Sequence, residues 1–183
     1  LVVIPAVQRP IRIGPGRLDP AVADRGVGRL ETDGLRRAEA ELIAPVAAGK
    51  IIVDPTNPLK ADFTGLATGP DASGAELLAV LLPESHVVKA FNTLFAGNTA
   101  NPQGFGFQLD SLFATDDESA KDAVCGLSSS IGFRPIHVGP LAAARELEAM
   151  AWLNIRLQLL TNGAWNTAYA LVAPPAASLT AAA

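Results

Sequence analysis

The chain has 183 residues, of which 49% are hydrophobic and 17% charged, a composition that suits a folded domain and not a disordered segment. A formal net charge of -4, with no long run of lysine or arginine, argues against a nucleic-acid partner. The single cysteine excludes an internal disulfide, the two histidines have no metal-ligand spacing, and no apolar stretch reaches the ~20 residues of a membrane span.

The first 50 residues predict a strand, an irregular stretch and a helix. Leu1 to Ile4 is typical of a buried strand. Prolines and glycines then interrupt the chain as far as about Thr32. Residues 33–46 recover the periodicity of a helix, which Gly49 ends.

Strand and helix signals alternate from Lys50 to Val138. Short apolar runs predict strands at 51–53, from 87, at 111–114 and after the turn that begins at Gly132. Two capping boxes predict helix starts, Ser73 to Glu76 for a helix at 75–82 and Thr115 to Glu118 for a helix ending near Ser130. This alternation predicts a doubly wound parallel α/β sheet.

The last 45 residues are different. Gly139-Pro140 predicts the start of one long helix, from 141 to about 160, which Asn162-Gly163 closes. An uncovered apolar face on this helix favours a homodimer. The tail at 174–183 has low complexity and is expected to be disordered.

Small polar residues follow two of the predicted strands. Asn57 comes shortly after the first and Asn92-Thr93 after the second. The carboxyl ends of parallel strands are where such sheets bind ligands, so these residues would share one rim of a site. Asn57 alone could be a turn residue, since Asn-Pro favours turns. A second asparagine at a second strand end is harder to explain in that way.

Six segments stand in the order seen in the NADPH-dependent coenzyme F420 reductases, and the same module resembles the cytosolic reductase domain of the STEAP metalloreductases. The segments are Asp54–Leu59, Ser73–Glu76, Val88–Thr93, Asp116–Lys121, Gly132–Pro135 and Gly139–Glu148. The resemblance implies a partial Rossmann-like, NADP-binding domain over 1–138, irregular at 1–32, with a small, mainly helical C-terminal domain over 139–173.

The resemblance also implies a function, the transfer of a hydride between NADPH and coenzyme F420 or a flavin-like acceptor, by a cytoplasmic enzyme. Hydride passes directly between two rings, so no catalytic acid, base or metal is expected. The positions that match cofactor-binding residues are Asn57, Pro58, Asn92, Thr93, Leu94, Gly139, Pro140, Leu141 and Arg145. Arg145 could instead be a solvated ion-pair residue, and Trp152 could stack on a ring or belong to the core.

The sequence departs from the family at its beginning. The expected glycine-rich phosphate loop is not recognisable, and the nearest candidate, Gly14 to Asp19, has Asp19 in place of the third glycine. Leu1 to Val7 instead matches a later strand of the family, so the first third of the domain would be missing and 8–32 would be an insert. Two other functions stay open: a catalytically impaired binding or oligomerisation module, and a different NAD(P)-dependent reductase of small imines or keto acids.

Overall fold

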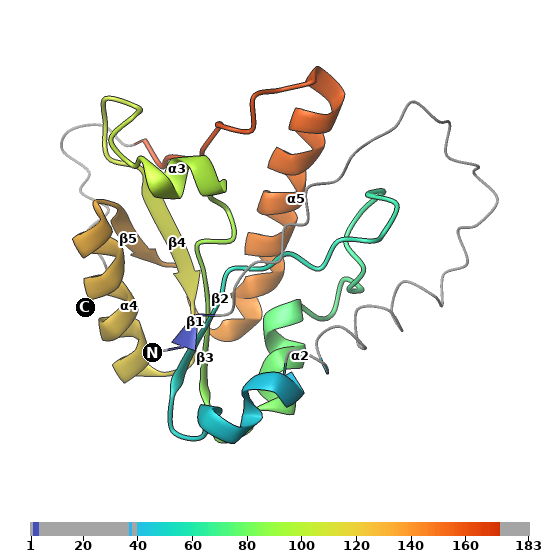
Figure 1. The fold of residues 1–183 in the computed structure, drawn as a ribbon, viewed down its shortest axis with the longest axis vertical. Helices are drawn as coiled ribbons and strands as arrows, with labels where there is room; N and C mark the ends of the chain where they lie inside the picture. The colour runs from blue at the N-terminus through green and yellow to red at the C-terminus, as the bar shows by residue number, and fades with distance from the viewer. Residues whose placement is uncertain (1, 4–36, 38–39, 173–183) are drawn as a thin grey trace.

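The computed structural model describes residues 2–3, 37 and 40–172, which form a five-stranded sheet with helices on both faces (Figure 1). The order of the strands in the sheet is their order in the chain: β1 (Val2–Val3), β2 (Ile51–Asp54), β3 (His86–Ala90), β4 (Asp110–Ala114) and β5 (Arg134–His137). Residues 40–47 are helical, and the labelled helices are α2 (Gly74–Leu81), α3 (Ala96–Ala100), α4 (Glu118–Ile131), the 3-10 turn η2 (Leu141–Ala143) and α5 (Ala144–Thr161). The candidate phosphate loop, Gly14 to Asp19, lies outside the described residues.

The core lies on both faces of the sheet, because neighbouring residues of a strand point in opposite directions. Ile52 and Val87 pack with α2, η2 and the helix at 40–47. The next residues in each strand, Val53 and Val88, pack against α4 on the other face. Helix α5 covers β4 through Leu147. The predicted α/β class with a Rossmann-like sheet is confirmed.

One strand pairing corrects the prediction of a parallel sheet. β3 and β4 are antiparallel, with Lys89 opposite Ala114, whereas the other three described pairings are parallel. The reason is the connection between them, which contains only the single-turn helix α3 and no crossover helix. Because β4 is reversed, a right-handed connection from β4 to β5 places α4 on the face opposite α2.

The helix ends follow the local sequence, with one correction. Ser73 and Glu76 form the predicted capping box of α2. At α4 the cap is not Thr115 but Asp117, whose Oδ1 accepts from the Ala120 N–H at 2.7 Å. Thr115 lies two residues before the cap, where its hydroxyl donates to the Val87 carbonyl at 3.1 Å and accepts from the Asp117 N–H at 3.3 Å.

The residues after α5 return across the fold without forming a helix or strand up to residue 172. Asn98 Nδ2 donates to the Thr167 carbonyl at 2.8 Å, and the Leu171 N–H donates to Asp110 Oδ2 at 2.6 Å. This segment therefore ties the end of α5 back to α3 and to the start of β4.

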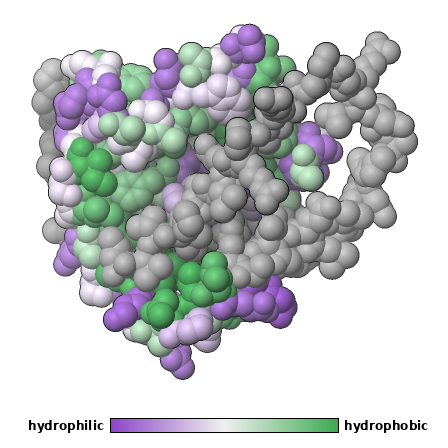
Figure 2. All heavy atoms as spheres, viewed as in Figure 1, coloured by the Kyte–Doolittle hydropathy of each residue, from purple (hydrophilic) through white to green (hydrophobic). Residues whose placement is uncertain are grey.

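Apolar side chains are exposed at the end of the molecule that carries the helix at 40–47 and α2 (Figure 2). Leu42 is 81% exposed, Val46 61% and Val80 78%.

Among the described residues, none of the helices combines the length and hydropathy needed to cross a bilayer.

Candidate functional site

The carboxyl ends of β2 and β3 lie side by side and carry the two asparagines. The strands are parallel, with Asp54 opposite Lys89, so the residues that follow them meet at one edge of the sheet. Asn57 Nδ2 donates to the backbone carbonyl of Asn92 at 3.0 Å. In return, Asn92 Nδ2 donates to Asn57 Oδ1 at 3.0 Å. The two amides thus hold the two strand ends together.

The orientation of the Asn92 amide is fixed by the two acceptors that surround its nitrogen. Its Nδ2 also donates to the Leu147 carbonyl of α5 at 3.0 Å, so both neighbours of this nitrogen are acceptors. A flipped amide would bring oxygen against oxygen, which decides the assignment. Within the described part of the chain, Asn92 Oδ1 is then buried and has no hydrogen-bond donor.

An unpaired, buried acceptor is unusual in a folded protein and costs about 1–3 kcal/mol. Asn92 is only 5% exposed, so bulk water does not compensate for the missing donor. The chemical complement of this atom is an N–H donor, of the kind that a primary carboxamide offers.

A buried charge cluster lies directly behind the asparagines, and the sequence analysis missed it. Lys89 Nζ contacts Asp54 Oδ2 at 3.0 Å, Glu148 Oε1 at 2.7 Å and the Thr56 carbonyl at 2.6 Å. The three donors of the ammonium group therefore have three acceptors. Lys89, Asp54 and Glu148 are each 0% exposed. The signal in the sequence was a lysine inside the apolar run of β3, which is buried on both faces and so requires a charged partner.

Glu148 also joins α5 to the first turn of α2. Its two carboxylate oxygens accept from the Gly74 N–H at 3.0 and 3.1 Å. A Cβ at position 74 would lie 3.3 Å from Glu148 Oε1 and 3.5 Å from Pro58 Cγ, so the close approach depends on glycine. Burial raises the pKa of Glu148, although Lys89 and the Gly74 N–H favour its charged form.

Arg145 is part of an ion pair within the fold. Its Nε and Nη2 donate to the two oxygens of Glu76 at 2.9 and 2.7 Å. Glu76 also accepts from the Ser73 N–H at 2.8 Å, within the capping box. Burial raises the pKa of Glu76, but the hydrogen bonds from Arg145 and Ser73 outweigh this and hold it below its ordinary value. Arg145 therefore fastens α5 to α2.

The other predicted site residues divide between the two ends of the sheet. Pro58, Thr93 and Leu94 are buried at the rim with the asparagines. The turn at 139–141 lies at the amino ends of β2 and β3. There, the Gly139 carbonyl accepts from the Thr115 N–H at 3.2 Å, and Leu141 packs with residues that precede each strand. The structure does not bring Gly139, Pro140 and Leu141 together with Asn57 and Asn92.

Two open hollows lie along α5, under the loop that follows β2. One has a volume of about 260 Å³ and is lined by Leu66, Thr68, Gly69, Pro70, Ala72, Arg145, Glu146, Glu148 and Ala149. The other has a volume of about 360 Å³ and is lined by Phe63, Thr64, Trp152, Arg156, Leu159 and Leu160. In the described ranges, no group of three or more histidine, cysteine or acidic side chains is placed to hold a metal ion.

No profile of a known protein family matches the chain. It is 38% identical over 109 residues to metalloreductase STEAP3 of Rattus norvegicus and 35% identical over 119 residues to the F420-dependent NADP reductase of Methanocaldococcus jannaschii. These matches cover 59% and 61% of this chain. The chain spans 21% of the metalloreductase and 52% of the NADP reductase.

Two solved structures share the fold at about 30% identity. A protein from Arthrobacter sp. FB24, assigned as an F420-dependent NADP reductase, matches with a TM-score of 0.63 at 31% identity, over 79% of this chain and 66% of that one. A hypothetical protein from Sinorhizobium meliloti matches with a TM-score of 0.52 at 30% identity, over 57% of this chain and 53% of that one. The resemblance inferred from the order of the motifs is therefore confirmed.

Proposed function

We propose that this chain acts in an NADP-dependent oxidoreductase and holds the nicotinamide at the rim formed by β2 and β3. The observation that carries the proposal is the reciprocal Asn57–Asn92 pair, which leaves one buried acceptor, Asn92 Oδ1, without a donor. The proteins similar to this chain, which are named as a metalloreductase and an NADP reductase, support the same class of reaction.

In this function the side chains that cover Asn92 Oδ1 would move aside, and this atom would accept a hydrogen bond from the carboxamide of the nicotinamide. Asn57 and the Leu147 carbonyl fix the Asn92 amide in advance, so little ordering is left for binding. When bound, NADPH supplies a hydride, and we propose coenzyme F420 or a flavin-like molecule as the acceptor. The role of the protein is to align the two rings and exclude water, and no described residue is assigned as an acid or base.

Titration calorimetry with NADPH, followed by NADPH oxidation with F420 as acceptor, tests the proposal. Replacing Asn92 by alanine removes the acceptor, and we expect NADPH affinity to fall about tenfold, the worth of one hydrogen bond to a buried group. Asn101→Ala is the matched control, because Asn101 is exposed and distant in sequence from both strand ends. Absence of NADPH binding by the folded wild-type chain would refute the proposal and favour a non-catalytic module.

We also propose that the protein is cytoplasmic and forms a homodimer. The support for the dimer is the outer side of α5, where Leu153 is 50% exposed and Leu157 47%. Analytical ultracentrifugation would decide this, and a purely monomeric protein at high concentration would exclude the dimer.

A further inference from the structure

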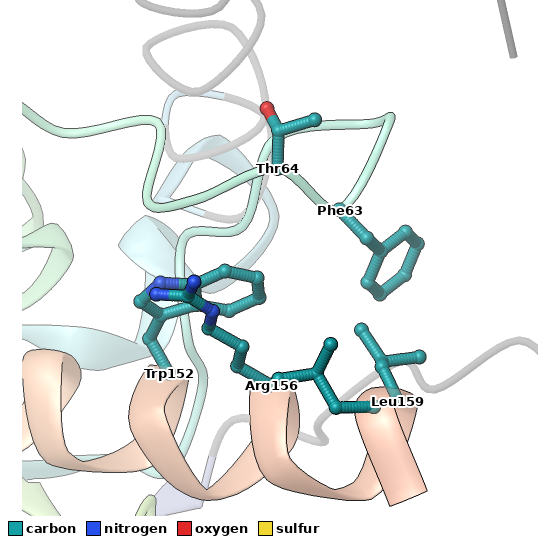
Figure 3. Close-up of a pocket in the computed structure, with 6 residues that line it drawn as sticks. Phe63, Thr64, Trp152, Arg156 and Leu159 are labelled. Carbon is teal, nitrogen blue, oxygen red and sulfur yellow. The ribbon is translucent and has the colours of Figure 1, made fainter. Parts of the chain in front are cut away.

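The larger hollow has aromatic walls contributed by two separate elements. Figure 3 shows Phe63 on the loop after β2, facing α5, from which Trp152, Arg156 and Leu159 project. Trp152 lies four residues beyond Glu148, which contacts Lys89 behind the rim. The hollow therefore begins about one helical turn from the candidate site.

The tip of the loop is built to present Phe63. Leu59 and Leu66 form an antiparallel bridge, and the Phe63 N–H donates to the Lys60 carbonyl at 2.9 Å. Asp62 Oδ1 accepts from both the backbone N–H and the hydroxyl of the next-but-one residue, Thr64. Phe63 itself has φ of 56°, a left-handed conformation that is unfavourable for a bulky residue. The turn thus holds an aromatic ring where glycine or asparagine would be easier to place.

Arg156 supplies a positive charge that no described residue neutralises. Arg134 and Arg145 are each bound through two nitrogens by a carboxylate. Arg156, in contrast, is exposed and has no ion pair or hydrogen bond to any residue that the structure describes. A guanidinium beside aromatic side chains suits a ligand that is both planar and anionic.

We propose that this hollow binds a planar aromatic ring that carries an anionic arm, with the ring against Phe63 and Trp152 and the arm on Arg156. A volume of about 360 Å³ lies in the range of small-molecule pockets. The identification of this ligand as the hydride acceptor rests on the proposed function. It adds that the acceptor is recognised through an anionic group and by residues outside the asparagine rim.

Trp152 provides a direct readout. The chain has two tryptophans, so a Trp165→Phe background leaves Trp152 as the reporter. Titration with riboflavin 5′-phosphate and with uncharged riboflavin should quench its fluorescence, and the phosphate form should bind about ten- to a hundredfold more tightly. Arg156→Gln should abolish this difference. Arg37→Gln, at another exposed arginine, should preserve it.

Phe63→Gly tests whether the aromatic ring itself contributes to binding. The substitution removes the ring, and glycine adopts the left-handed backbone of this position without strain. We expect weaker binding of both flavins with unchanged thermal stability. Absence of quenching, equal affinity for the two flavins in the presence of Arg156, or quenching that requires self-association of the chain would each overturn the inference.

A parallel NADPH titration separates the two proposals. NADPH binding without flavin quenching overturns this inference alone. Quenching that depends on Arg156, without NADPH binding, supports the hollow and refutes the proposed function.

Discussion

Replacing Lys89 by methionine tests how strongly the buried charge cluster holds the rim. Methionine keeps the length of the side chain but removes the charge, leaving the carboxylates of Asp54 and Glu148 in a site that is 0% exposed. Removing one partner of a buried ion pair typically costs 3–5 kcal/mol. A domain of this kind has roughly 5–15 kcal/mol of stability in total, so the substitution should remove a large part of it.

The loss should depend on pH, with a defined sign. Lys89 favours the charged form of Glu148, so its removal should raise the pKa of Glu148 beyond the increase that burial already produces. The native variant then binds this proton more tightly than the unfolded chain does. Stability therefore falls as pH rises from about 4.5 through the raised pKa, and the variant should be closest to wild type in mild acid.

Urea unfolding at pH 5 and pH 8 measures both quantities, since the slope of each transition shows whether the folded state stays compact. Lys121→Met is the matched control. Lys121 pairs with Glu118, whose side chain is 81% exposed, and such surface pairs contribute about 0.3–0.5 kcal/mol. A loss below about 1 kcal/mol for Lys89→Met, or an equal loss at both pH values, would show that the cluster is not buried as described.

Three further predictions concern the same fold. Glu148→Gln should flatten the decline of stability between pH 5 and pH 8 that the raised pKa of Glu148 produces in the wild type; parallel slopes in urea titrations would contradict this. Ser73→Ala removes the hydroxyl that accepts from the Glu76 N–H and should cost about 1 kcal/mol of unfolding free energy, whereas Ser73→Thr should retain most of it. Gly132→Ala places a Cβ 2.9 Å from Gln103 Nε2 at a φ of 108° and should cost about 1–2 kcal/mol, so an unchanged melting temperature would refute the assigned backbone.

The elements that the sequence predicts well are those with local chemical signals. The capping box at Ser73 and the left-handed end of α5 at Asn162 are both present, because each depends on residues a few positions apart. Helix α3 was missed because it is five residues long and the side chain of its N-cap residue, Phe95, makes no capping hydrogen bond. The cap of α4 was placed two residues early, because Thr115 and Asp117 are both residue types that favour caps and only the structure shows which of them begins the helix.

The site was predictable only where neighbouring parallel strands define it. Asn57 and Asn92 meet as expected because β2 and β3 are parallel neighbours. The turn at 139–141 was predicted to help bind the same cofactor, but it follows β5, which is parallel to the reversed strand β4. Its carboxyl end therefore lies at the opposite edge of the sheet. Strand direction depends on long-range pairing, which no local motif reports.

Two consecutive residues of α5 connect the charge cluster to the candidate site. The Leu147 carbonyl accepts from Asn92, while the Glu148 side chain contacts Lys89 and the Gly74 N–H. An apolar cluster of similar volume would often be as stable as a buried ion cluster, so stability alone does not account for these charges. Their directional bonds fix α5 in one position and rotation relative to both strand ends, and apolar contacts would not. A displacement of α5 would withdraw the Leu147 carbonyl and leave the Asn92 amide held by Asn57 alone, so the charges behind the rim help to fix the direction of its unpaired oxygen.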